Sequence, residues 1–61
     1  MTTDEQVRDI RQRTGLSQAA FAERYEIPKR TIENWEAGKR EPPSYVLRML
    51  EILVDHHWDA E

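Results

Sequence analysis

The chain has 61 residues, no cysteine and a formal net charge of −3 at pH 7. A chain of this length makes one small domain, and without disulfides or thiolate metal sites it must rely on compact helix packing or on association with other chains. No apolar run is long enough to span a membrane, and the polar, acidic start TTDEQ is unlike a signal peptide. We therefore expect a single cytoplasmic domain over residues 1–61.

The first helix is expected over residues 4–14. Thr3 suits its N-cap, and Gln6 three residues later completes a capping box. Gly15 is expected to end the helix, because glycine reaches positive φ at no steric cost. The side facing the core should carry Val7 and Ile10.

A second helix is expected to start at the N-cap Ser17, with Leu16 and Phe21 at the two positions of a hydrophobic staple. Phe21, Ala22 and Tyr25 form its inward side. The small Ala19 and Ala22 would allow a neighbouring helix to approach closely.

A turn at residues 25–27 leads to a third helix, for which Pro28 suits the first turn. This helix should reach about Ala37 and be anchored in the core by Ile32 and Trp35. Gly38 is its expected C-terminal glycine. Residues 39–43 contain two prolines and are expected to form a loop.

The fourth helix is expected from Ser44 to about His56 and has two apolar stripes. A helix that is apolar on two sides has two partners. The first stripe should pack in the core, and it comprises Val46, Leu47, Leu50, Leu53 and Val54. The second could meet another copy of the chain, and it comprises Tyr45, Met49 and Ile52.

Charge is unevenly distributed along the chain. Residues 8–13 hold three arginines and one aspartate (+3 − 1 = +2), and residues 28–40 hold four cations and two glutamates (+4 − 2 = +2). Residues 48–61 hold one arginine and four carboxylates (+1 − 4 = −3), within which residues 55–61 form a short acidic tail. A small domain whose positive and negative charges are separated in this way can present a basic face to phosphates despite its negative net charge.

Two segments, LSQAAFA at residues 16–22 and TIENWEAGKREPP at residues 31–43, resemble the helix-turn-helix domain of lambda-type phage repressors, Cro proteins and many bacterial antitoxins, the XRE family. The resemblance covers roughly residues 7–53. It implies an all-α fold, a compact lambda-repressor-like bundle of four to five helices with the helix-turn-helix unit at residues 17–37. It also implies a sequence-specific transcription regulator, most often a repressor, that binds double-stranded DNA at palindromic operators as a homodimer.

The resemblance also assigns roles to individual residues. Gln18 matches a glutamine that touches a phosphate and braces a base-reading side chain. Base reading falls to Lys29, Arg30 and Asn34, with Thr31 near a phosphate or a thymine methyl. Backbone contact falls to Lys39 and Arg40. Arg11 and Glu36 match a mostly buried ion pair between the first and third helices.

The chemistry of the third helix agrees with these roles. Its side opposite Ile32 and Trp35 carries Arg30, the usual bidentate reader of guanine, and Asn34, which can pair with adenine. Glu33 on the same side would repel a phosphate or accept a hydrogen bond from a cytosine amino group, which narrows the tolerated sequences.

The chain departs from the family at two places. Glu26 stands where a glycine is common, so positive φ is expected at a non-glycine residue. The family commonly has a fifth helix, where this chain has only DHHWDAE, so part of the fourth helix would be uncovered. Dimer contact through that helix is expected to involve Tyr45, Met49, Ile52 and Trp58.

Other functions are weighed against this one. The acidic tail or the fourth helix could instead hold a protein partner such as a toxin, as in an antitoxin or small phage regulator. Trp58 could equally fold back onto its own domain. The adjacent His56 and His57 point apart on a helix, so we expect no metal and no cofactor. Ser17 and Ser44 are explained as helix caps, and we expect no enzyme activity.

Overall fold

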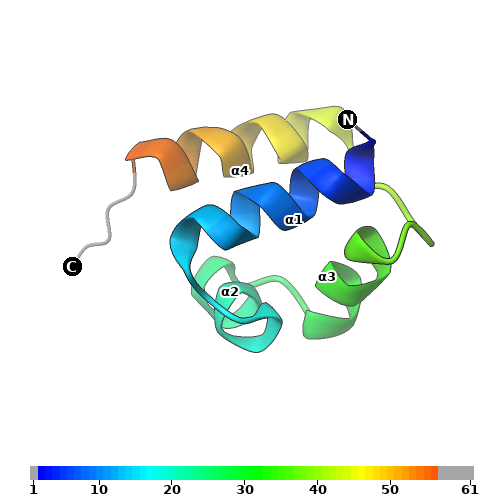
Figure 1. Cartoon of the computed structure of the whole chain (residues 1–61), viewed down its shortest axis with the longest axis horizontal. Helices are drawn as coiled ribbons and strands as arrows, with labels where there is room; N and C mark the ends of the chain where they lie inside the picture. The colour runs from blue at the N-terminus through cyan, green and yellow to red at the C-terminus, as the bar shows by residue number, and fades with distance from the viewer. Residues whose placement is uncertain (1, 57–61) are drawn as a thin grey trace.

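The computed structural model describes residues 2–56, in which all regular secondary structure is helical. Helix α1 spans Thr3–Thr14, α2 spans Gln18–Tyr25, α3 spans Lys29–Glu36 and α4 spans Ser44–His56. In Figure 1 α1 lies between α4 on one side and the pair α2–α3 on the other. The predicted all-α fold is confirmed, and α2, the short turn and α3 form the predicted helix-turn-helix unit.

The first helix begins one residue earlier than the sequence predicted. The N-cap is Thr2, not Thr3, and its N–H donates to the Glu5 carboxylate at 3.1 Å, so Glu5 and not Gln6 completes the capping box. A carboxylate suits this place better than an amide because it also faces the positive end of the helix dipole. Gly15 ends the helix at φ 76°, as predicted.

Helices α2 and α3 end in the same hydrogen-bonding pattern. At the end of α2 the Ile27 N–H donates to the Ala22 carbonyl at 2.9 Å, and at the end of α3 the Lys39 N–H donates to the Asn34 carbonyl at 2.9 Å. Both are Schellman motifs, which require a left-handed residue. Gly38 supplies it after α3 with φ 79°, whereas Glu26 supplies it after α2 with φ 57°. The positive φ predicted for Glu26 is therefore present.

The core forms where α1, α2 and α3 converge, and α4 closes it from the α1 side. Trp35 is buried as predicted, whereas Ala19 is exposed, so only Ala22 provides the close approach expected of both alanines. Phe21 and Tyr25 also contact each other, with ring centroids 4.8 Å apart. The buried apolar residues are Val7, Ile10, Phe21, Ala22, Ile32, Trp35, Leu50 and Val54.

Helix α4 rests on α1 and runs beside it in the same direction (Figure 1). Among residues 2–56, its backbone does not come close to α2 or α3. One side of α4 therefore has no covering helix among the described residues, and Leu53, predicted to be in the core, is 47% exposed. Together with the predicted second stripe it forms what we call the α4 stripe, namely Tyr45, Met49, Ile52 and Leu53.

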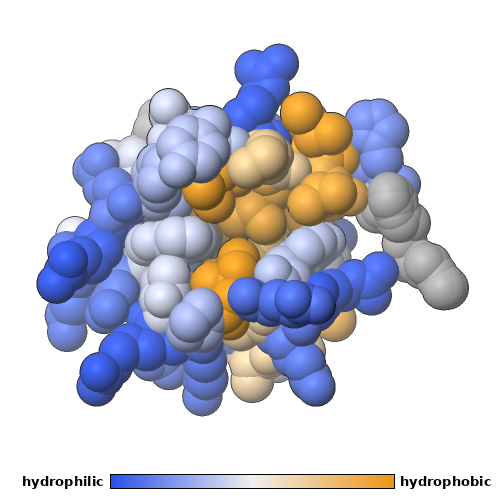
Figure 2. Space-filling model, turned by 180° about the vertical axis from the view of Figure 1, so that it is seen from behind, coloured by the Kyte–Doolittle hydropathy of each residue, from blue (hydrophilic) through white to orange (hydrophobic). Residues whose placement is uncertain are grey.

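Apolar side chains gather on the face of the molecule seen in Figure 2, including the end where α4 finishes. Pro42, in the loop predicted between α3 and α4, is buried. No helix within residues 2–56 has both the length and the apolar character needed to cross a membrane.

The left-handed residue at position 26 yields a stability prediction. Replacing Glu26→Gly should raise the free energy of unfolding by about 1 kcal/mol, because a side chain at positive φ costs about that much. Gly15→Ala should lower it by a similar amount, since no atom lies within 4 Å of the added methyl group and only backbone strain changes. Urea unfolding of both variants and of the wild type measures the effect. A Glu26→Gly variant no more stable than the wild type would contradict it.

Candidate nucleic-acid interface

The third helix is held by its apolar side and presents its polar side to solvent. Pro28 stands at its N-cap, one residue before the position predicted for it, and its carbonyl accepts from the Thr31 N–H at 2.9 Å. Ile32 and Trp35 are buried. The helix therefore turns Lys29, Arg30 and Glu33 outward.

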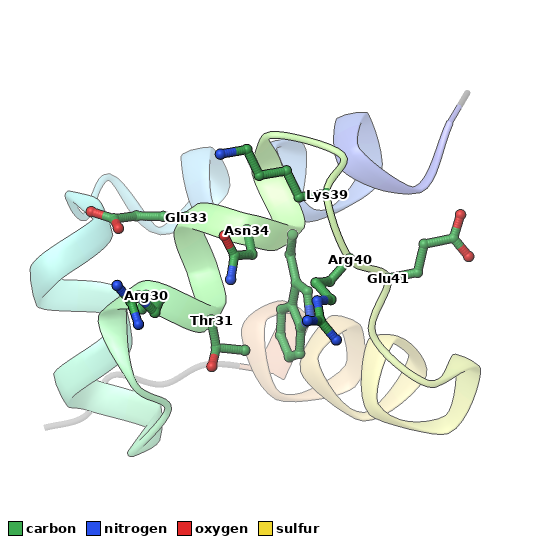
Figure 3. Close-up of a pocket in the computed structure, with 8 residues that line it drawn as sticks. Arg30, Thr31, Glu33, Asn34, Lys39, Arg40 and Glu41 are labelled. Carbon is green, nitrogen blue, oxygen red and sulfur yellow. The ribbon is translucent and has the colours of Figure 1, made fainter.

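The polar side of α3 and the loop after it line one open hollow, which Figure 3 shows. The loop reaches this place because the Schellman motif reverses the chain at Gly38, where the N–H groups of Lys39 and Arg40 both donate to the Asn34 carbonyl, at 2.9 and 3.3 Å. Lys29 lies one residue before Arg30 on the same helix. The lining residues are Arg30, Thr31, Glu33, Asn34, Trp35, Lys39, Arg40 and Glu41.

The structure thus brings most of the predicted DNA contacts together on one surface. We call this the basic surface. It comprises Arg30, Thr31, Asn34, Lys39 and Arg40, which line the hollow, together with the exposed Lys29 in the first turn of α3. In residues 2–56 no ion pair involves Arg30, Lys39 or Arg40, whereas Lys29 Nζ lies 3.6 Å from a Glu33 carboxylate oxygen. Three cations of the surface are therefore available to an anionic partner.

The basic stretch at residues 8–13 has a different use. The Arg8 guanidinium donates to the Glu36 carbonyl at 2.7 Å, and Arg11 binds the Glu36 carboxylate. Arg13 contacts Asp9 and Asp55 at 3.0 and 2.7 Å, which joins α1 to α4. These three arginines serve the fold, so the basic stretch at residues 8–13 offers a partner less charge than the stretch at residues 28–40.

The first turn of α3 is charged in the opposite sense to the first turn of α1. Helix α1 has Asp4 and Glu5 in its first turn and Arg11 and Arg13 in its last, the order that the helix dipole favours. Helix α3 has no acidic residue in its first turn, where Lys29 and Arg30 face the positive end of the dipole. Cations combined with free helix N–H groups make a site suited to phosphate and other anions.

Behind the basic surface lies a group that we call the Glu36 cluster, comprising Arg8, Arg11, Gln18 and Glu36. The Glu36 side chain is 5% exposed. Its carboxylate accepts from Arg11 Nε at 2.6 Å and from Arg11 Nη2 at 3.1 Å, which is the predicted ion pair in bidentate form. Arg11 Nη1 also donates to the Leu16 carbonyl at 2.9 Å, at the entry to α2.

Gln18 contacts a buried carboxylate. Its amide donates to the Glu36 carboxylate at 3.1 Å, and not to one of the side chains expected to read bases, whereas its contact with a phosphate stays a prediction. Glu36 ends α3 and is buried, whereas the residues expected to read bases lie on the outer side of that helix. The Glu36 cluster therefore ties the start of α2 and the end of α3 to α1.

Comparison with known families agrees with this geometry. The family model described as a helix-turn-helix domain matches residues 5–54. The chain belongs to the helix-turn-helix domain family. Searches among curated proteins and among solved structures found no significant match. Membership of this family indicates a DNA-binding regulator, and its members are typically not enzymes.

The buried Glu36 carboxyl group is stabilised in its ionised form. Burial raises the pKa of Glu36, but the hydrogen bonds from Arg11 and Gln18 and the charges of Arg11 and Arg8 outweigh burial, so the pKa lies below its ordinary value of 4.5. The carboxylate is therefore ionised at pH 7 and binds Arg11 as a full ion pair.

Within residues 2–56 no three His, Asp or Glu side chains are grouped so that they could hold a metal ion. The ring of His56 lies 2.9 Å from the Ile52 carbonyl, at the end of α4. His57 and Trp58 lie outside the described residues.

The Glu36 cluster yields a second prediction. Arg11→Met should lower the free energy of unfolding by about 3–5 kcal/mol, because it leaves the buried Glu36 carboxylate without its cation. That is comparable to the whole stability of a domain of this size, so far-UV circular dichroism should show a largely unfolded chain.

Two matched variants control this experiment. Arg13→Met removes only exposed ion pairs and should cost no more than about 1 kcal/mol. Arg11→Met combined with Glu36→Leu should restore much of the stability, since an apolar pair of similar volume often replaces a buried ion pair without loss. Equal losses for Arg11→Met and Arg13→Met would contradict the role of the cluster.

Proposed function

We propose that the protein is a sequence-specific double-stranded DNA-binding transcription regulator, a repressor that binds a palindromic operator as a homodimer. The observation that carries the proposal is the basic surface, in which Arg30, Lys39 and Arg40 lie on α3 and the following loop without an ion-pair partner in residues 2–56. The resemblance to lambda-type repressors supports repression, rather than activation, of transcription.

In this proposal α3 lies in the major groove of DNA. Arg30 and Asn34 line the same hollow, and their side chains are suited to guanine and adenine respectively. Lys29 reads a further base, and Thr31 contacts a phosphate or a thymine methyl. Gln18, Lys39 and Arg40 contact the phosphate backbone and fix the register of α3.

A homodimer is proposed because one small domain makes few DNA contacts, and two half-sites multiply affinity and specificity. The α4 stripe is the proposed interface. Its four side chains are 47–67% exposed, and they recur at helical spacing along one side of α4. Trp58, also predicted at this interface, remains a prediction because it lies outside the described residues.

A second candidate function rests on the same stripe. An exposed apolar side of a helix is also suited to a protein partner. The protein would then act as an antitoxin or a small phage regulator whose main role is to bind another protein, such as a toxin. The two functions are compatible, because the basic surface and the α4 stripe share no residue.

The proposed roles of the basic surface predict different outcomes for two variants. Arg30→Ala should relax base preference at one position of each half-site by about 1–3 kcal/mol, because it removes a base contact. Lys39→Ala should weaken binding to all sequences alike, because it removes one phosphate contact. The slope of log affinity against log salt concentration should fall by about one. Titrations of both variants against duplexes with single base changes at several salt concentrations measure this. Uniform losses in both variants would contradict the division of roles.

The proposed interface predicts a change in oligomeric state. Met49→Asp combined with Ile52→Asp should shift the protein from dimer to monomer in sedimentation equilibrium, since two carboxylates would be buried against apolar partners. Ala19→Asp is the control, because it places one of these carboxylates at an exposed position on α2, away from α4. A dimer that survives the double substitution would place the interface elsewhere, and a wild-type monomer would favour the protein-partner function.

A further inference from the structure

The outer side of α3 carries an ion pair that contributes little to the fold. Lys29 Nζ lies 3.6 Å from Glu33 Oε2, and the two side chains are 56% and 48% exposed. Exposed pairs at this helical spacing stabilise a helix weakly. Here lysine precedes glutamate, which is the less favourable order with respect to the helix dipole. The pair is thus poorly explained as a stabilising element of α3.

The geometry of the pair leaves its hydrogen-bonding groups available. A separation of 3.6 Å is an ion pair and too long for a hydrogen bond. The ammonium group therefore keeps three donors, and the carboxylate oxygens remain acceptors. A strong donor and a strong acceptor stand side by side, and Glu33 lines the same hollow as Arg30 and Asn34 (Figure 3).

Such a donor and acceptor match the major-groove edge of one base pair best. The edge of G·C presents the acceptors N7 and O6 of guanine and then the amino donor of cytosine. Lysine can bind both guanine acceptors while glutamate accepts from the cytosine amino group. The edge of A·T presents acceptor, donor and acceptor, so a carboxylate that binds the adenine amino group also faces the thymine O4 atom and is repelled.

We propose that Lys29 and Glu33 read a single G·C base pair as a unit, with Lys29 on guanine and Glu33 on cytosine. This inference rests on the proposed function and makes Glu33 a specificity-determining residue. Lysine alone would bind guanine in several orientations. The neighbouring carboxylate restricts the ammonium group, and it also requires cytosine on the opposite strand.

The test begins with selection from a random duplex library by the wild-type protein and by the Lys29→Ala, Glu33→Ala and double variants. We expect the wild type to specify G·C at one position of the half-site, and both single variants to lose preference at that same position. On fixed duplexes, replacing this G·C pair should weaken wild-type binding about 5- to 150-fold. The double variant should discriminate no worse than the single variants, because the two residues act together.

Modified bases separate the two halves of the unit. N4-methylcytosine at the shared position removes the groove-facing amino hydrogen, so it should weaken the wild type and leave Glu33→Ala unaffected. 7-Deazaguanine removes the N7 acceptor and should weaken the wild type but not Lys29→Ala. Glu41→Ala is the control, since it removes a carboxylate from the same hollow but lies in the loop. It should change affinity for all sequences without a change of preference.

The possible failures are distinguishable. Enrichment of A·T at the shared position, or effects of the two variants at different positions, would overturn the paired reading and leave sequence-specific DNA binding intact. If the wild-type protein enriches no sequence, the proposed function and this inference both fail.

Discussion

The bidentate ion pair between Arg11 and Glu36 is the interaction on which the rest of the helix-turn-helix domain depends. Glu36 is the last residue of α3, and Arg11 lies near the end of α1. Through the Leu16 carbonyl and Gln18, the same two side chains also fix the start of α2. Within residues 2–56 the apolar core cluster is small, and it does not by itself specify how these three helices are angled. Directional hydrogen bonds from one buried carboxylate supply that angle, and the angle decides where the outer side of α3 lies.

The cations of α1 and those of α3 and the following loop differ in their partners. The cations of α1 are paired with Glu36 or with the carboxylates of α1 and α4, whereas Arg30, Lys39 and Arg40 have no ion-pair partner in residues 2–56. The net charge of −3 is therefore a poor guide to how the molecule meets an anion. The first turn of α3 is also arranged against its own dipole, which lowers local stability. Sites of function commonly carry such a local conflict, and the conflict here lies at the residues proposed to read DNA.

Much of the fold could be predicted because the residues at and next to a helix end determine where the helix begins and ends. Ser17, Gly15 and Gly38 act through their own backbone and nearest neighbours, and the structure places them as predicted. Ala19 and Leu53 were misplaced because their burial depends on which helix lies opposite, which periodicity does not reveal. The one-residue shift from Thr3 to Thr2 reflects two adjacent threonines that are equally able to cap a helix.

In the candidate site too, local features could be predicted and contacts between distant residues could not. The gathering of Arg30, Thr31, Asn34, Lys39 and Arg40 on one surface followed from helical spacing and from the glycine that turns the loop back. The partner of Gln18 and the burial of Pro42 could not be predicted, because both depend on side chains that are distant in sequence. The Lys29–Glu33 ion pair was open to prediction from its spacing of four residues, which is the usual spacing for such pairs.

The central claim is that the basic surface distinguishes one DNA sequence from another. The most direct measurement is the ratio of equilibrium affinities for the best selected duplex and for a scrambled duplex of equal length and composition, at about 0.15 M salt where non-specific binding is weak. The account predicts a ratio of at least about a thousand, as specific DNA-binding proteins typically show. A ratio near one, with binding to both duplexes lost as salt rises, would contradict it.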